Sequence, residues 1–236
     1  MGSQNRPGPR DAYDCIAVTS VLDSTALFGA LPEAVRAQLS GQAELRRFAR
    51  NDVIFRQGDE ATELFVVSDG RVAIGTSSRD GRETVVAVLD DGSLFGEMGL
   101  FDGAPRSADA RALTDVTVVV LGYEPARRVL EEQPVLLWDI VRLLARRLRA
   151  TDEALADAVF LDVPARTAKR LLELAGDADE FRLQVTQEEL AGMVGASRER
   201  VNKAISLFGR LGWMEARGRN RYRILDRAAM EERATQ

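Results

Sequence analysis

The chain contains 236 residues, of which 45% are hydrophobic and 29% are charged, and its net charge is −5. This length is enough for one large domain or two ordinary ones, and the composition is that of a folded globular protein. The sequence contains one cysteine and no histidine, which excludes an intrachain disulfide, thiolate-held iron–sulfur clusters, proximal-histidine haem and most metal sites.

Charge is distributed unevenly along the chain. From Pro164 onward there are 14 basic and 11 acidic residues, whereas the preceding residues include 18 basic and 26 acidic ones. An acidic front and a basic tail are typical of a nucleic-acid-binding module joined to another domain, although ordinary solvated surfaces also reach this imbalance. No apolar run approaches the ~18 residues of a membrane-spanning helix, and an apolar signal core is missing. We therefore expect a cytoplasmic protein without a membrane partner.

Two predicted segments make up residues 1–133. Residues 1–20 contain prolines and little periodicity, which indicates a flexible leader. Residues 21–133 begin with a short helix at 32–42 and then alternate β-rich runs with Asp-Gly turns, a spacing typical of an antiparallel barrel or sandwich. The runs cover residues 53–55, 64–67, 72–74, 84–88 and 116–121.

A long helix is predicted over residues 134–161. Its apolar residues recur in steps of four and three, at Leu137, Val141, Leu144, Leu148, Leu155 and Ala158. Such a seam pairs with another helix, and self-association as a parallel homodimer is the simplest option. Thr151 occupies one seam position, where it either fixes the coiled-coil register or serves a ligand.

The tail, residues 164–236, predicts short helices at 167–175, 187–194 and 198–210, followed by a hairpin formed by 213–216 and 221–225. Thr186 and Ser197 are suitable N-caps, and Gly195 suits the left-handed position that ends a helix. Two helices separated by so brief a turn must cross steeply, as in a helix-turn-helix.

Side chains on the last of these helices suit the edges of DNA bases. Arginine and lysine match guanine, glutamate matches cytosine and asparagine matches adenine, and the candidate residues are Arg198, Glu199, Asn202 and Lys203. Arg217 and Arg219 on the hairpin would contact phosphates as a wing. The alternative is a helical pair and a hairpin with ordinary solvated charges.

Residues 94–108 form a candidate phosphate site. A glycine-rich turn at Gly96 frees backbone N–H groups to face an anion, and Arg106 and Ser107 can complete the site. Glu97 is an acceptor suited to a ribose hydroxyl. By chemistry alone, Glu97 and Arg106 could equally form a structural ion pair.

The whole arrangement resembles the bacterial cyclic-AMP receptor protein / fumarate-nitrate regulator superfamily, and most closely its actinobacterial cyclic-AMP receptor branch. The resemblance covers roughly residues 25–226 and rests on Gly-Glu-Met-Gly-Leu-Phe…Pro-Arg-Ser-Ala and Val-Gly-Ala-Ser-Arg-Glu-Arg-Val. It implies an α+β fold with an N-terminal antiparallel, jelly-roll-like β-roll that binds a cyclic nucleotide. A long dimerisation helix and a C-terminal winged helix-turn-helix would follow.

The resemblance also implies roles for individual residues. Arg106 and Ser107 would hold the cyclic phosphate, together with the backbone from Gly96 to Met98. Glu97 would accept the ribose 2′-hydroxyl, and Arg147 would brace Glu97. Thr151 would hydrogen-bond the purine from its own subunit, and Asp152 would reach the purine across the dimer.

For the whole protein, the resemblance implies a regulator rather than an enzyme. Cyclic AMP would be its allosteric ligand, without metal, haem or iron–sulfur cluster. The protein would be a homodimer that binds a palindromic site in double-stranded DNA, with Thr186 and Ser197 at the helix starts, and it would contact RNA polymerase.

Two departures keep alternatives open. Asp152 stands where close relatives have serine or asparagine, and a carboxylate accepts from guanine as well as from adenine. The ligand could therefore be a guanine-containing cyclic dinucleotide, or the protein could regulate without a ligand. Lys203 stands where the best-known member of the family has arginine. A lysine is a single point charge instead of a rigid fork of donors, so we expect looser base readout at this position. An enzyme using Glu97 or the pair Asp90 and Asp91 as acid and base is a third, weaker hypothesis.

Overall fold

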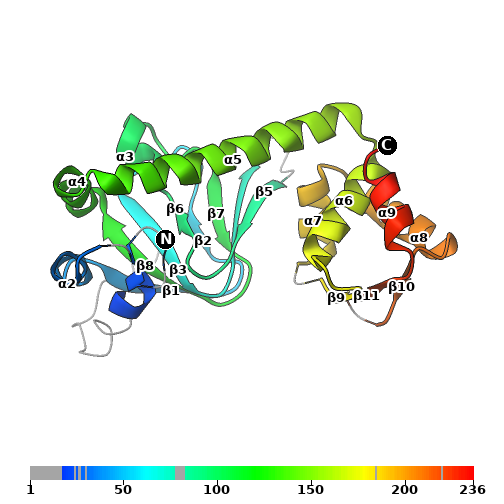
Figure 1. The fold of residues 1–236 in the computed structure, drawn as a ribbon, viewed down its shortest axis with the longest axis horizontal. Helices are drawn as coiled ribbons and strands as arrows, with labels where there is room; N and C mark the ends of the chain where they lie inside the picture. Colours follow the sequence, from blue (N-terminus) through cyan, green and yellow to red (C-terminus); the bar gives the residue numbers. More distant parts are fainter. Residues whose placement is uncertain are drawn as a thin grey trace, which may run out of the picture. The chain divides into compact units, whose positions relative to one another are not determined.

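The computed structural model describes residues 18–23, 25, 28–29, 31–77, 83–183, 185–218 and 220–236 (Figure 1). Most of the predicted leader, with Cys15, and the wing residue Arg219 lie outside these residues. The described part of the chain forms two compact units. One comprises the residues up to Ile74 together with Val88–Leu143, and the other comprises Leu144–Gln236 together with the described part of Gly75–Ala87.

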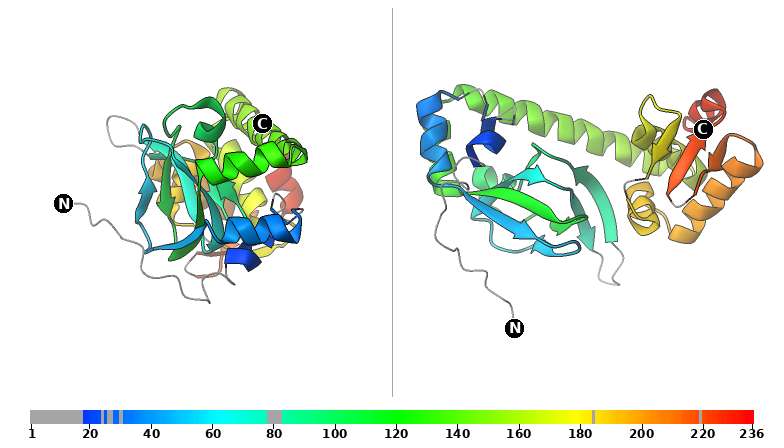
Figure 2. Two further views of the ribbon diagram at one scale, coloured as in Figure 1. Left: turned by 90° about the vertical axis from the view of Figure 1, so that its left-hand side faces the viewer. Right: turned by 90° about the horizontal axis from the view of Figure 1, so that it is seen from below.

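Two antiparallel sheets contain the strands β1 to β8, and the first unit holds these strands except the end of β4 and most of β5. Their strand orders are β1-β8-β3-β6 and β2-β7-β4-β5, and Figure 2 shows the strands curling into a roll. The strands are β1 (Glu44–Phe48), β2 (Val53–Phe55), β3 (Glu63–Asp69), β4 (Val72–Ser77), β5 (Glu83–Leu89), β6 (Leu94–Phe95), β7 (Asp109–Ala112) and β8 (Val116–Gly122). The helices are α2 (Glu33–Ser40), α3 (Met98–Asp102) and α4 (Tyr123–Glu132). This confirms the predicted β-roll.

Strand β3 shows why its run of four apolar residues is continuous rather than alternating. Leu64 and Val66 belong to a core cluster shared with the helices, whereas Phe65 and Val67 belong to a second cluster formed with the other sheet. Both faces of the strand are therefore covered, so neither face needs polar residues. The antiparallel partner β8 pairs Leu64 with Leu121 and Phe65 with Val120.

The long helix α5 spans Val135–Phe160, one residue shorter at each end than predicted. Leu148 is 62% exposed and Leu155 is 64% exposed, and Leu137 and Val141 on the same predicted seam are exposed as well. A helix that leaves large apolar side chains in water has not used its seam within this chain. The homodimer itself stays a prediction.

The second unit contains α6 (Val163–Ala175), β9 (Glu180–Arg182), α7 (Gln187–Val194), α8 (Arg198–Arg210), β10 (Met214–Ala216), β11 (Arg221–Ile224) and α9 (Arg227–Arg233). Its three strands form a sheet of order β10-β11-β9. Helices α7 and α8 have the predicted bounds. The predicted hairpin is confirmed with each strand one residue shorter.

The predicted start of α6 at residue 167 was wrong by four residues. Asp162 caps the helix by accepting a hydrogen bond from the Ala165 N–H at 2.8 Å, and Pro164 lies in the first turn. Proline is tolerated there because its missing N–H would be unpaired in any case. Short elements without a long periodic pattern were also missed: β1, β6, β7, α3, α4, β9 and α9.

Candidate functional site

Arg106 is the best-fixed residue of the predicted phosphate segment. Its backbone N–H donates to the carbonyl of Asp59 at 2.9 Å, and its carbonyl accepts from the N–H of Gly58 at 2.9 Å. These two bonds tie residue 106 to the turn that follows β2. The β-roll therefore fixes the backbone position from which the Arg106 side chain extends.

The Arg106 guanidinium is buried without a carboxylate. Only 7% of the residue is exposed. Its Nη1 donates to the carbonyl of Gly96 at 2.7 Å and its Nη2 to the carbonyl of Glu63 at 2.8 Å. The guanidinium carbon lies 4.3 Å from the centre of the Phe55 ring, and within the described residues Nε has no hydrogen-bond partner. Among the described residues, the partners of this buried cation are carbonyl oxygens, the Tyr123 hydroxyl and aromatic rings, so it is short of negative charge.

The structure decides the alternative of an ion pair between Glu97 and Arg106. The donors of Arg106 go to carbonyls and to the hydroxyl of Tyr123, which lies 3.3 Å from Nη1. Arg106 therefore does not pair with Glu97 in this structure. Glu97 is itself 1% exposed, immediately precedes α3 and lines a small cavity together with Leu64 and Leu94, so it is buried between the sheet and the helices.

Gly96 occupies a position that only glycine fits. Its φ of +74° is in the left-handed region, and an added Cβ would lie 2.7 Å from Arg106 Nη1 and 3.0 Å from Phe65 Cδ2. Both the backbone strain and the clash would act on the same residue. The glycine of the predicted segment is thus needed to let the backbone approach the arginine.

Met98 and Ser107 meet at the surface of the same segment. The Ser107 hydroxyl donates to Met98 Sδ at 3.4 Å, and both residues are exposed. The structure therefore brings together all five residues predicted for the phosphate and ribose. They are Gly96, Glu97, Met98, Arg106 and Ser107.

Tyr123, at the start of α4, was missed by the sequence analysis. Its hydroxyl donates to the carbonyl of Gly96, the same oxygen that accepts from Arg106. Burial raises the pKa of Tyr123 above its ordinary value, although the nearby Arg106 lowers the pKa. The phenol therefore stays a donor at neutral pH. No local pattern signals this role, because the residues are 27 positions apart.

The remaining predicted ligand residues lie on α5. Arg147 is half-buried, whereas Thr151 and Asp152 are exposed. The Thr151 hydroxyl donates to the carbonyl of Arg147 at 2.9 Å, which leaves its oxygen able to accept. All three belong to the second compact unit, so their part in the site stays a prediction.

Helices α7 and α8 are joined as the sequence predicts. The Thr186 hydroxyl accepts from the N–H of Glu189, whose carboxylate accepts from the N–H of Thr186 at 2.7 Å. Gly195 ends α7 with a φ of +68°, and Ser197 caps α8. The facing residues Leu190, Val194 and Val201 are buried. Together these features fix the short turn between the two helices and bury the apolar faces that they share.

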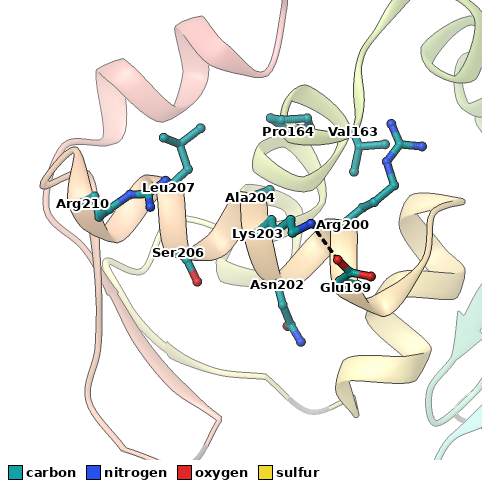
Figure 3. A pocket seen from close by; sticks show the side chains of 10 residues that line it. All are labelled: Val163, Pro164, Glu199, Arg200, Asn202, Lys203, Ala204, Ser206, Leu207 and Arg210. Carbon is teal, nitrogen blue, oxygen red and sulfur yellow. Dashed lines mark ion pairs between the residues drawn. The ribbon is translucent and has the colours of Figure 1, made fainter.

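The predicted base-reading residues lie on the outer face of α8. Arg198, Glu199 and Lys203 are exposed, and Asn202 is half-buried. Figure 3 shows the ion pair between Lys203 Nζ and Glu199 Oε1, at 2.6 Å. The hydrogen bond from Lys203 holds the pKa of Glu199 below its ordinary value. Arg217 is also exposed and pairs with Glu215.

Arg166 is a second residue missed by the sequence analysis. Its Nε donates to the carbonyl of Val194, at the end of α7, at 3.0 Å. Its Nη1 donates to the carbonyl of Leu161 at 2.8 Å and to that of Ala158 at 3.3 Å. One side chain therefore joins α6, the last turn of α5 and the helix pair.

Two kinds of feature are missing from the described residues. None of their helices has the length and apolar character needed to cross a membrane. Their acidic side chains also do not gather into a group that could hold a metal ion.

Family models match both units. Residues 45–133 match the cyclic nucleotide-binding domain, and residues 165–233 match the Crp-like helix-turn-helix domain. The first match contains the Arg106 segment and the second contains α7 and α8. The contacts of Arg106 and the helix pair therefore lie inside the two matched domains, whereas Arg147, Thr151 and Asp152 lie between them.

Curated proteins are similar to this chain over most of its length. The CRP-like cAMP-activated global transcriptional regulator of Mycobacterium tuberculosis is 36% identical over 85% of this chain and 92% of its own. The cAMP-activated global transcriptional regulator CRP of Haemophilus influenzae is 31% identical over 74% of this chain and 81% of its own.

Solved structures agree. The c-di-GMP-responsive global regulator CLP of Xanthomonas campestris superimposes with a TM-score of 0.73 at 27% identity, over 82% of this chain and 99% of that one. A CRP/FNR-family regulator of Thermus thermophilus superimposes with a TM-score of 0.66 at 27% identity, over 82% of this chain and 99% of that one. The chain therefore belongs to the CRP/FNR family and is a cyclic-nucleotide-responsive, DNA-binding transcription regulator rather than an enzyme.

Proposed function

We propose that the protein is a homodimeric regulator whose affinity for a palindromic DNA site is raised by cyclic AMP. The observation that carries this proposal is the buried guanidinium of Arg106, which has carbonyl and aromatic partners but no carboxylate among the described residues. A cyclic phosphate carries one negative charge and would supply what the guanidinium lacks. Charge-assisted hydrogen bonds of this kind are about twice as strong as neutral ones.

The rest of the ligand would be held by groups around Arg106. Ser107 would add a hydroxyl to the phosphate, in place of its present contact with Met98, and the backbone from Gly96 to Met98 would add amides. Glu97 would accept the ribose 2′-hydroxyl and Arg147 would brace Glu97. Thr151 and Asp152 would bind the purine from the two subunits.

Coupling to DNA requires that the ligand bind the DNA-competent state better than the other state. The exposed apolar residues of α5, including Leu148 and Leu155, would pair with a second copy. Ligand bound against this helix would then bias the position of both recognition helices. Sites on successive major grooves lie about 34 Å apart. Such a dimer would act in the cytoplasm and contact RNA polymerase.

The similar regulators of M. tuberculosis and H. influenzae are named as cAMP-activated, which supports cyclic AMP as the ligand. A second candidate is a guanine-containing cyclic dinucleotide. Asp152 favours it, because a carboxylate accepts well from the N1–H and N2–H₂ donors of guanine. The similar Xanthomonas regulator is described as c-di-GMP-responsive.

The decisive experiment is fluorescence anisotropy of a labelled palindromic duplex with TGTGA-type half-sites, at fixed salt. Titrations are made without ligand, with cyclic AMP, and with cyclic di-GMP. A tightening of tenfold or more with cyclic AMP, about 1.4 kcal/mol of coupling, supports the first proposal. The same response to cyclic di-GMP alone supports the second. Tight binding that ignores both ligands contradicts a ligand switch.

A further inference from the structure

The part of α5 that belongs to the second compact unit carries a regular seam. The seam residues follow one another in steps of four and three and are Leu144, Leu148, Thr151, Leu155 and Ala158. Leu148 and Leu155 are exposed. In a coiled coil, whose seven-residue repeat is lettered a to g, these residues occupy positions a and d, and the e and g residues flank the seam on either side.

The flanks of this seam carry two charged residues. Residues 145, 152 and 159 occupy e positions, and residues 147 and 154 occupy g positions. Three of these five are alanine or valine, and the charged ones are Arg147 and Asp152. The outer positions b, c and f hold the other charges of this stretch, at Arg146, Arg149, Glu153 and Asp157. Arg147 and Asp152 are therefore the two charges placed to meet another helix.

The spacing of the two charges suits contact between helices rather than within one. Asp152 follows Arg147 by five positions, whereas side chains on the same helix meet at spacings of three and four. In a parallel pair of helices, a g residue lies opposite the e residue five positions later in the partner. Arg147 would therefore face Asp152 of the partner subunit. A twofold interface repeats each contact, so a homodimer would contain two such pairs.

Both groups have the capacity for this contact. Asp152 is exposed, and within the described part of the chain its carboxylate has no cationic partner. Arg147 is half-buried, and a guanidinium carries five N–H donors. Arg147 can therefore bind a carboxylate of the partner subunit and keep its other contacts. The charges are opposite in sign, so the contact is attractive.

We infer that Arg147 of each protomer forms an ion pair with Asp152 of the partner subunit, and that the two pairs select a parallel second copy in this register as the occupant of the seam. A copy shifted by one heptad would place Ala145 or Val159 opposite Arg147. Such a copy would leave both charges without the attractive contact. This inference rests on the homodimer of the proposed function.

The ion pair also changes what Asp152 offers to a nucleotide. An unpaired carboxylate would repel a ligand that carries a cyclic phosphate, whereas pairing with an arginine neutralises the charge. The two oxygens of a carboxylate provide about four acceptor sites, so the paired group still accepts from the amino group of a purine. Under the proposed function, one carboxylate would then serve both the dimer contact and the ligand site.

The test mixes two full-length variants with reversed charges, Asp152→Arg and Arg147→Asp. Each variant alone brings like charges together in its homodimer, and the mixed dimer restores both attractive pairs. Equal amounts are mixed in urea and refolded together without nucleotide or DNA. Native mass spectrometry then measures the three dimers, which differ in mass. Random association gives about one half mixed dimers, and from the usual strength of exposed ion pairs and like-charge contacts we expect about four fifths or more.

The matched control uses the residues next to the pair. Arg146→Asp and Glu153→Arg reverse the same kinds of charge at exposed f positions, which face away from the seam. We expect this mixture to stay near one half mixed dimers. Damage to the fold cannot imitate the expected result, because each substitution is present in the mixed dimer as well as in its homodimer. Circular dichroism checks the helix content of every variant.

The outcomes separate this inference from the proposed ligand switch. A mixed fraction near one half for Asp152→Arg with Arg147→Asp overturns the ion pair, and so does an equal rise in the control mixture. A chain that stays monomeric contradicts both the ion pair and the proposed homodimer. Preferred mixed dimers support the ion pair even if the unmodified protein ignores cyclic AMP, a result that contradicts the switch alone.

Discussion

The two predicted binding regions of this protein hold their charged residues in opposite ways. Arg106 is buried, tied at both its backbone and its guanidinium, and short of negative charge. Lys203 and Glu199 are exposed and satisfied by each other at 2.6 Å. The Arg106 region is held in place by hydrogen bonds and lacks an anionic partner. The Lys203 region is exposed to solvent, and its charges already neutralise each other.

The difference follows from solvation. A buried charge cannot be satisfied by water, so an arriving phosphate gains strong hydrogen bonds without having to displace a counter-ion. An exposed ion pair is worth little and breaks easily, so Lys203 and Glu199 can turn toward bases when DNA arrives. Tight recognition of one small anion and adaptable reading of a long polymer thus call for different environments.

The largest effect is expected for Arg106→Leu, which removes the buried cation of the first region. Loss of two charge-assisted hydrogen bonds to the ligand amounts to about 3 kcal/mol or more, so we expect at least a hundredfold loss of cyclic-nucleotide affinity and no ligand-stimulated DNA binding. Calorimetric titration measures the affinity, and circular dichroism checks the fold. Arg128→Gln on α4 is the charge control. Unchanged stimulation in Arg106→Leu contradicts the site.

A second test compares two glycines near the site. Gly96→Ala combines left-handed strain with a Cβ placed 2.7 Å from Arg106 Nη1, so we expect a loss of about 3 kcal/mol in the free energy of unfolding. Gly103→Ala has a similar φ of +68° but no atom within 4 Å of the new Cβ, and should cost about 1 kcal/mol. Urea unfolding measures both. Equal losses would mean that crowding against Arg106 is unimportant.

A third test addresses base readout. Glu199→Gln removes the acceptor that suits cytosine, so we expect roughly tenfold weaker discrimination at one base pair of each half-site. Because Glu199 and its ion-pair partner Lys203 are both exposed, we expect no change in thermal stability. Competition binding against duplexes substituted at single positions measures the discrimination. A uniform loss on all duplexes would show that Glu199 positions the helix rather than reading a base.

The smallest expected effect concerns the ion pair itself. Lys203 lowers the pKa of Glu199, so the ionised pair is present above the ordinary pKa of glutamate and is lost as pH falls through the lowered value. In Lys203→Gln the pKa of Glu199 should rise toward its ordinary value. Carboxyl chemical shifts followed by NMR against pH report the change. A pKa that stays low would assign the shift to another group.

The sequence predicted the helix pair well because its signals are local. Thr186 and Glu189 are three residues apart, and Gly195 and Ser197 lie within the turn they define. Such caps form from neighbouring residues and need no tertiary partner. The same reason explains the confirmed bounds of α7 and α8.

Other features could not be found in this way. The start of α6 was misplaced because Pro164 was taken to precede the helix, whereas the Asp162 cap makes Pro164 part of its first turn. The strand β9 is three residues long and exists through its pairing with β11. An element of that length has too few side chains to show a period.

Sequence analysis alone identified the family, the glycine and arginine of the phosphate segment, and the side chains of α8 that suit DNA bases. Only the tertiary structure showed that Arg106 has carbonyl and ring partners instead of Glu97, and that Tyr123 shares the Gly96 carbonyl. The physical reason is distance along the chain. Composition and short motifs state which groups are available, whereas burial and pairing between residues 10 to 50 positions apart decide which charges remain unsatisfied.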